Sequence, residues 1–133
     1  MNTKVMIAFS NMIYSEGVKK LLESTVDFEV SDVFKTSGLK AGTNPYGMIK
    51  SFEPDVILVD FITLYNEFGD VGQAHGMRLV LLDTGCGEDN ITSAVADKGL
   101  KGVLAANSTP LILKKAISSV AKGNVWFSRI GLV

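Results

Sequence analysis

The chain has 133 residues, of which 47% are hydrophobic and 20% are charged, a composition typical of a single globular domain in water. Lys and Arg number 13 and Asp and Glu 14, so the net charge of −1 argues against a nucleic-acid-binding surface on this chain. One cysteine excludes an intrachain disulfide, and no apolar run reaches the ~20 residues of a membrane span. We therefore expect a cytoplasmic protein without membrane contact.

The first third of the chain predicts two strands with a helix between them. The apolar run Lys4 to Phe9 is typical of a buried strand, and Ser10 or Asn11 can cap the helix that follows. This helix extends to about Ser24, and a second strand follows from Asp27 to Phe34. The apolar positions of the helix recur at helical spacing and predict its buried face: Ile13, Gly17, Val18, Leu21 and Leu22.

The next segment begins with a loop and ends in the most informative strand. Lys35 to Thr43 contains two glycines and small polar residues, and Asn44-Pro45 is a typical start for a short helix up to Phe52. The uninterrupted apolar run Val56 to Val59 predicts a strand buried on both faces, and it ends at Asp60. Ligands of open parallel sheets bind beyond the carboxyl ends of the strands, so Asp60 marks the candidate site.

The second half of the chain repeats this alternation after a stretch without clear periodicity, Ile62 to Met77. Arg78 to Leu82 and Gly102 to Ala106 predict two further buried strands. The two helices of this half begin at Glu88 or Asp89 and at Thr109-Pro110, and a glycine ends each of them. Strands that alternate with helices predict an α/β fold, with a parallel five-stranded sheet and helices on both faces. We interpret residues 1–123 as one domain and 124–133 as a tail or the start of a linker.

Four stretches of the chain, in order, carry a resemblance to a known family. They are Ser15-Glu16-Gly17-Val18-Lys19-Lys20-Leu21-Leu22-Glu23, Pro54 to Asp60, Lys98 to Leu104, and Ser108-Thr109-Pro110 with the exit Lys122 to Ser128. Together they resemble a response-regulator receiver domain, most closely the receivers of nitrate-response and LuxR-type transcription factors. The resemblance implies a flavodoxin-like sheet with strand order 2-1-3-4-5, and it implies that Asp60 stands at the phospho-acceptor position.

Several residues at this site depart from the receiver pattern. The resemblance implies two acidic Mg²⁺ ligands after the first strand, where the chain has Phe9 and Ser10, and a lysine after the fifth strand, where it has Ala106. The hydroxyl residue of the fourth strand is matched by Asp83, although a shift of one residue would place Thr84 there. Mg²⁺ prefers several hard oxygen ligands, so we expect its binding to be weak or absent, and we expect no other cofactor.

These departures favour a pseudo-receiver that is not an enzyme. Phosphoryl transfer depends on positioning and on neutralised charge, and a pocket without the metal ligands and the lysine has no countercharge for a phosphoryl group at Asp60. The resemblance then implies a domain that works as a homodimer or with a partner protein, and that reaches DNA only through a C-terminal domain absent from this chain. The expected contact face combines the last helix with the fifth strand and the helix before it: Ala105, Ala106, Leu111, Ile112, Lys115 and Ser119.

Two other functions remain open from the sequence. The first is a working phosphorelay receiver that is phosphorylated on Asp60, because the acceptor carboxylate itself is present. The second is a small flavodoxin-like protein that binds a nucleotide or a flavin, although no glycine-rich fingerprint follows the first strand.

Minor hypotheses concern single residues near the same end of the sheet. Asp60 and Asp83 could form a carboxylate pair that shares a proton or a metal. Cys86 could be a nucleophile if His75 activated it, and the turn from Thr84 to Gly87 could hold a phosphate. We expect the aromatic residues of the tail, Trp126 and Phe127, to pack against the last helix.

Overall fold

The computed structural model describes residues 2–36, 46–68 and 76–127. Most of the predicted loop from Lys35 to Thr43, the Asn44-Pro45 helix start, His75 and the end of the tail lie outside these residues. Within the described ranges, no helix combines the length and the apolar character needed to cross a bilayer.

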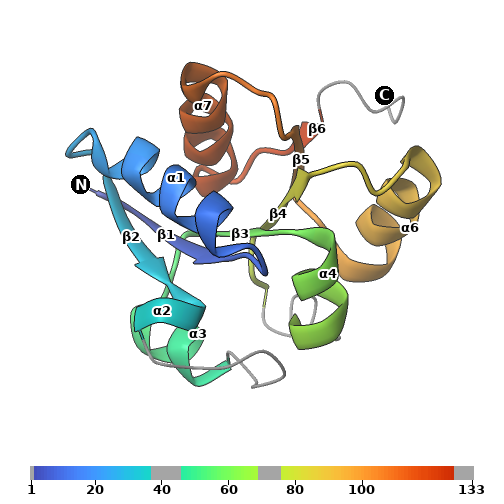
Figure 1. Ribbon diagram of the computed structural model, residues 1–133, viewed down its shortest axis with the longest axis horizontal. Coiled ribbons are helices and arrows are strands. Elements are labelled where there is room, and N and C mark those ends of the chain that lie inside the picture. Colours follow the sequence, from blue (N-terminus) through green and yellow to red (C-terminus); the bar gives the residue numbers. More distant parts are fainter. Residues whose placement is uncertain (1, 37–45, 69–75, 128–133) are drawn as a thin grey trace.

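The strands in the described ranges run parallel in one sheet (Figure 1), in the order β2-β1-β3-β4-β5-β6. Parallel order 2-1-3-4-5 confirms the predicted arrangement, but the sheet has six strands where the sequence analysis predicted five. The bounds are β1 (Thr3–Ala8), β2 (Phe28–Asp32), β3 (Val56–Val59), β4 (Leu79–Asp83), β5 (Gly102–Ala105) and β6 (Trp126–Phe127).

The helices cover both faces of the sheet, as predicted (Figure 1). Alternate residues of each central strand point to opposite faces, and each face has its own apolar cluster. The helices α1 (Met12–Glu23) and α7 (Pro110–Ala121) pack on one face through Leu22 and Ile117. The elements on the other face are α2 (Val33–Thr36), α3 (Tyr46–Phe52), α4 (Phe61–Thr63), the π-helical turn η1 (Leu64–Phe68) and α6 (Glu88–Lys98).

Helix ends follow the predicted capping residues closely. Asn11 rather than Ser10 is the N-cap of α1, because its side chain accepts a hydrogen bond from the Tyr14 backbone N–H at 3.0 Å. Thr109 caps α7 in the same way, ahead of Pro110 at the first helical position. Gly99 ends α6 in the left-handed conformation that favours glycine.

The predicted buried face of α1 is partly wrong. Val18 and Leu22 are buried as expected, and Ser15 joins them. Ile13, however, is 86% exposed and Leu21 is 38% exposed. Helical spacing groups apolar residues but does not tell which of them the sheet covers, and α1 carries apolar residues on more than one side.

The second strand is also shorter than predicted. β2 ends at Asp32, and the apolar residues Val33 and Phe34 begin the short helix α2. Asp32 makes this change of direction possible, since its carboxylate accepts hydrogen bonds from the Phe34 backbone N–H at 3.1 Å and from the Ser15 hydroxyl at 2.5 Å. A buried carboxylate with two donors costs far less than an unpaired one.

The final strand β6 lies in the segment predicted as a tail. Trp126 pairs with Gly102 and Phe127 pairs with Val103, so β6 covers the edge of β5 that the prediction left open. Trp126 packs against the cluster that contains the buried residues of α7, as expected, whereas Phe127 packs against the cluster on the opposite face. The sheet therefore continues beyond the last helix.

Candidate functional site

The Asp60 carboxylate lies at the carboxyl end of β3, next to the end of β1. The two strands pair in register at Ala8 and Val59, so the residues that follow them meet at the same edge. Oδ2 of Asp60 accepts hydrogen bonds from the Ser10 hydroxyl at 2.5 Å and from the Ser10 backbone N–H at 3.0 Å. Oδ1 accepts from the Thr63 backbone N–H at 3.0 Å, which makes Asp60 the N-cap of α4.

These contacts determine the charge of Asp60. Burial alone would raise the pKa of this carboxyl, but hydrogen bonds from the hydroxyls and backbone amides of Ser10 and Thr63 outweigh it and lower the pKa from its ordinary value of 3.8. A carboxylate accepts about four hydrogen bonds, and Asp60 receives three, two on Oδ2 from Ser10 and one on Oδ1 from the Thr63 backbone N–H. Asp60 is thus an ionised carboxylate, and hydrogen bonds already engage most of its lone pairs.

The position before Ser10 is occupied by a core residue. Phe9 is 3% exposed, belongs to the cluster beneath α1 and α7, and lies with its ring centroid 5.8 Å from that of Tyr14. A phenyl ring offers no ligand to Mg²⁺. The Ser10 hydroxyl donates its hydrogen bond to Asp60. Among the described residues, no three His, Cys, Asp or Glu side chains lie together in a way that could hold a metal ion. The residues present therefore do not fit the magnesium site of the receiver pattern.

Asp83 makes contacts within its own turn and not with Asp60. Its Oδ1 accepts hydrogen bonds from the backbone N–H groups of Gly85 at 2.8 Å and Cys86 at 3.1 Å. Burial opposes ionisation of Asp83, but these hydrogen bonds lower its pKa overall. Two carboxyls that share a proton are expected to have one raised pKa. The pKa values of Asp60 and Asp83 are both lowered, so they do not behave as such a pair.

The Cys86 thiol is not activated by its surroundings. Burial, together with its contact to the Asp83 carboxylate, raises the pKa of Cys86 to about 11. The Sγ atom lies 3.4 Å from Oδ1 of Asp83, close enough for the thiol to donate to the carboxylate. A nucleophilic cysteine needs the opposite shift, and the base suggested for it, His75, lies outside the described residues.

Tyr14 approaches the end of β5, where the receiver pattern has a lysine. Its hydroxyl donates to the backbone carbonyl of Ala106 at 3.4 Å. Burial, and to a lesser degree the charge of Asp83, raises the pKa of Tyr14, so the hydroxyl stays neutral. Ala106 itself is exposed. A neutral hydroxyl therefore lies where a cation would be needed.

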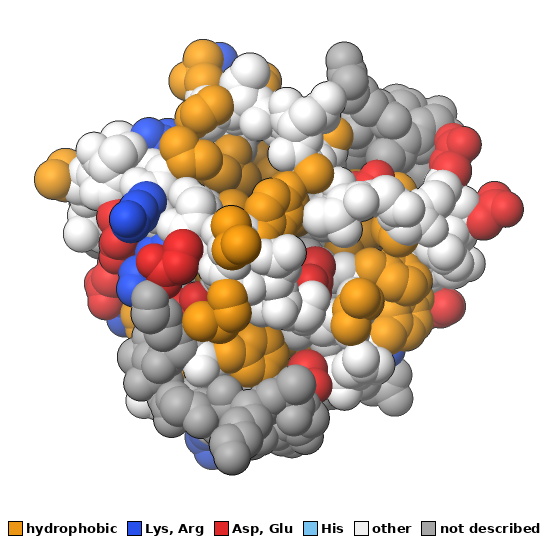
Figure 2. All heavy atoms as spheres, in the orientation of Figure 1, with side chains coloured by type: hydrophobic (Ala, Val, Ile, Leu, Met, Phe, Trp, Pro, Cys, Tyr) orange, Lys and Arg blue, Asp and Glu red, His pale blue; other side chains and the backbone are white. Residues whose placement is uncertain are grey.

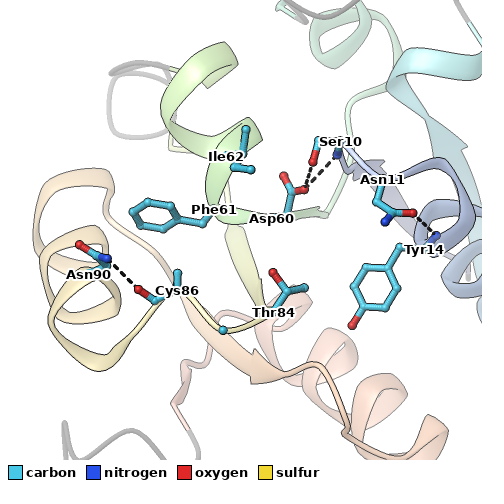
Figure 3. A pocket seen from close by; sticks show the side chains of 10 residues that line it. Ser10, Asn11, Tyr14, Asp60, Phe61, Ile62, Thr84, Cys86 and Asn90 are labelled. Carbon is cyan, nitrogen blue, oxygen red and sulfur yellow. Dashed lines mark hydrogen bonds between the residues drawn. The ribbon is translucent and has the colours of Figure 1, made fainter.

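A cavity of about 590 Å³ opens above Asp60 (Figure 3). Three of the predicted site residues line it, namely Ser10, Asp60 and Thr84, whereas Phe9, Asp83 and Ala106 do not. Cys86, suggested above as a nucleophile, also lines the cavity. The sequence analysis did not connect the other described side chains of the wall with this site, and they include two aromatic rings and two amides but no lysine or arginine: Asn11, Tyr14, Phe61, Ile62 and Asn90.

The residues of the expected contact face lie around two different pockets. Leu111 and Lys115 are exposed on α7, and Ser119 is half-buried beside them around a shallow pocket. Ile112 packs against the core cluster, while Ala105 and Ala106 line a separate groove beside α1. β6 pairs with Gly102 and Val103 of β5, and Ala105 lies beyond this pairing.

Comparisons with known proteins support the fold. No family model matches the chain, and no curated protein matches it. Among solved structures, the RcsB receiver domain of Salmonella enterica serovar Typhimurium, determined with the phosphomimetic BeF3⁻, has a TM-score of 0.72 at 20% identity, covering 97% of this chain and 95% of that chain.

Two further solved structures agree with it. A LuxR-family response regulator from Aurantimonas sp. SI85-9A1 has a TM-score of 0.77 at 19% identity, with 97% of this chain and 91% of that chain covered. The receiver domain of the putative regulator NarL from Mycobacterium tuberculosis has a TM-score of 0.71 at 20% identity, with 92% and 98% covered. The chain therefore has the α/β receiver fold, with one strand more than the sequence predicted.

Proposed function

We propose that this chain is the receiver-like signalling domain of a LuxR-type transcriptional response regulator, and that it acts through protein–protein contacts or dimerisation without phosphorylation of Asp60. The observation that carries the proposal is the hydrogen bonding of the Asp60 carboxylate, which Ser10 and Thr63 hold in place as a helix cap.

Two physical arguments support an inactive acceptor. A nucleophilic carboxylate needs a free lone pair directed at the phosphorus atom, and three hydrogen bonds from Ser10 and Thr63 occupy most of the lone pairs of Asp60. A phosphoryl group also needs neutralising charge, and the described wall of the cavity contributes no basic side chain and no second carboxylate for a metal.

The output of such a domain is a change in what it binds. The exposed part of the expected contact face, Leu111 and Lys115 on α7, is available to a partner protein. Contact with DNA would belong to a C-terminal domain, as the resemblance to LuxR-type receivers implies, because the near-neutral charge of this chain does not favour DNA binding.

The test is a direct attempt at phosphorylation. The protein is incubated with acetyl phosphate and Mg²⁺, and its intact mass is measured over time beside the Asp60→Asn variant. We expect both proteins to keep their mass. A phosphoryl adduct that forms on the wild-type chain and is absent from Asp60→Asn would establish the alternative, a working phosphorelay receiver.

A further inference from the structure

The Asp60 carboxylate is a buried negative charge without a positive partner among the described residues. Asp60 is 7% exposed, and the groups that contact it, on Ser10 and Thr63, are neutral hydrogen-bond donors. None of the groups that shift its pKa is a cation, and no described lysine or arginine lines the cavity above it. Buried charges in proteins are normally paired with an opposite charge. The cavity therefore lacks a cation that its floor would attract.

Other acidic groups at the same edge of the sheet add to this negative charge. Burial, and to a lesser degree the charge of Asp83, raises the pKa of Tyr14, so the field of Asp83 reaches the cavity wall. Glu88 and Asp89 lie exposed in the first turn of α6. In Figure 2, acidic side chains are spread over the α6 side of this face, and basic side chains gather mainly on the α1 side. No lysine or arginine occurs in the segments that follow the four central strands, 9–12, 60–66, 83–90 and 106–109. Charge of one sign around a cleft concentrates counter-ions in it.

The helices that begin at this edge do not reverse this preference. Free backbone amides at a helix N-terminus attract anions. Here, however, side chains of the chain itself cap three of these helices: Asn11 caps α1, Asp60 caps α4 and Thr109 caps α7. The fourth, α6, begins with two acidic residues. The edge therefore favours a cation over an anion.

Two aromatic rings give the cavity an apolar part beside the charge. Figure 3 shows Phe61 and Tyr14 on opposite sides of Asp60, and both side chains line the cavity. Each ring packs on a second one: the centroid of Phe61 lies 4.7 Å from that of Tyr65, and the centroid of Tyr14 lies 5.8 Å from that of Phe9. Aromatic rings attract cations as well as apolar groups. The walls thus suit an apolar or aromatic body attached to a positive charge.

We propose that this cavity binds a small organic cation, a primary ammonium attached to an aromatic or apolar group. The ammonium contacts the Asp60 carboxylate, and the body of the ligand lies between Phe61 and Tyr14. The volume of about 590 Å³ is in the range of small-molecule sites. The proposal deepens the proposed function, on which it rests: a bound cation takes the place of a phosphoryl group as the input to this domain.

Three probes that share one ring and differ in charge test the proposal. Benzylammonium is positive, benzyl alcohol is neutral and benzoate is negative. Each is titrated into the ¹⁵N-labelled protein at constant ionic strength, and the backbone amide shifts are followed by NMR. We expect benzylammonium to shift the amides of Ser10, Phe61 and Gly85, with a Kd at least about tenfold below that of benzyl alcohol. We expect no binding of benzoate. Absence of benzylammonium binding, equal binding of the three probes, or shifts confined to other parts of the chain would overturn the proposal.

Asp60→Asn removes the charge and keeps the size of the side chain. It should weaken benzylammonium by at least about tenfold and leave the weak binding of benzyl alcohol unchanged, a difference that a merely structural role would not produce. Glu29→Gln is the matched control, because it removes one negative charge at an exposed position of β2, outside the cavity. It should leave both dissociation constants unchanged. Equal effects of the two substitutions would contradict the assignment.

A second variant tests the cavity without altering the cap of α4. Thr84 is exposed and lines the cavity, so Thr84→Lys supplies an ammonium from the chain itself and should abolish benzylammonium binding. Ser93→Lys adds the same charge at an exposed position of α6 outside the cavity and should have no effect. Benzylammonium binding that survives Thr84→Lys would refute the site.

Two further titrations, with Mg²⁺ and with inorganic phosphate, separate the proposal from a receiver-like site. We expect neither to shift the amides of the cavity at the concentrations at which benzylammonium does. Tighter binding of Mg²⁺ or phosphate there would overturn the organic cation as the ligand. The phosphorylation assay described above is run on the same protein. An unphosphorylated chain that binds no benzylammonium would refute only the ligand, and a phosphorylated chain that binds it would refute only the proposed function.

Discussion

The hydroxyl of Ser10 lies 2.5 Å from Oδ2 of Asp60, across the ends of two adjacent parallel strands. In the receiver pattern, acidic side chains at this edge of the sheet hold a metal ion. Here one carboxylate lies beside one hydroxyl donor. The site therefore has the geometry of a helix cap that also joins β1 to β3.

Replacing Ser10 by alanine tests this structural role. Ser10→Ala removes one hydrogen bond to an ionised group but keeps the backbone N–H that contacts the same oxygen. We expect the free energy of unfolding to fall by about 1–2 kcal/mol in urea denaturation at neutral pH. Ser93→Ala, at an exposed position of α6, is the control and should change it by less than about 0.5 kcal/mol. Equal losses would mean that the contact contributes nothing.

The pH dependence of stability should report the lowered pKa of Asp60. A carboxyl whose pKa is lower in the folded than in the unfolded chain stabilises the fold above its ordinary value of 3.8, and this contribution disappears as the pH falls through the folded pKa. The difference in unfolding free energy between wild type and Asp60→Asn should therefore be constant near neutral pH and shrink below 3.8. In the Ser10→Ala background the shrinkage should be smaller. A difference that stays constant down to low pH would contradict this assignment.

The buried pair Ser15 and Asp32 should be coupled. The Ser15 hydroxyl donates to the Asp32 carboxylate at 2.5 Å, and both residues are almost completely buried. Ser15→Ala would leave a buried carboxylate oxygen without this donor and should cost about 1–3 kcal/mol in unfolding free energy. A double-mutant cycle with Asp32→Asn should give a coupling energy of at least about 0.5 kcal/mol. Additive effects would show that the hydrogen bond between Ser15 and Asp32 contributes no coupling energy.

Gly102 should be required for the pairing of β5 with β6. A Cβ atom at this position would lie 3.1 Å from the backbone oxygen of Trp126 and 3.4 Å from a methyl carbon of Val80. Gly102→Ala should push β6 away and destabilise the protein by about 1–3 kcal/mol. Emission from the single tryptophan should shift to the red as Trp126 gains exposure to water. Gly47→Ala, where the added Cβ meets nothing within 4 Å, should leave the emission unchanged.

Much of the fold follows from local signals in the sequence. Uninterrupted apolar runs such as Val56 to Val59 predict buried parallel strands, and the caps Asn11, Thr109 and Gly99 predict helix ends, because both depend on neighbouring residues alone. The strand β6 was missed for the opposite reason. Two residues carry no periodicity, and their strand conformation depends on the edge of β5, which lies more than twenty residues earlier in the chain.

The candidate site was predicted only in part. Asp60, Ser10 and Thr84 follow directly from the strand ends, but Tyr14 reaches the pocket through its long side chain from the first turn of α1. The exposed positions of Ile13 and Leu21 could not be predicted either, because the apolar pattern of a helix leaves open how many sides the rest of the fold covers.

The sixth strand also affects the tendency of the protein to aggregate in a crowded solution. A bare β5 would present unpaired amide and carbonyl groups along a flat apolar margin, which is a template for fibril growth between molecules. β6 occupies two of those positions with Trp126 and Phe127. Detachment of this short strand would thus lead to aggregation before the central core unfolds.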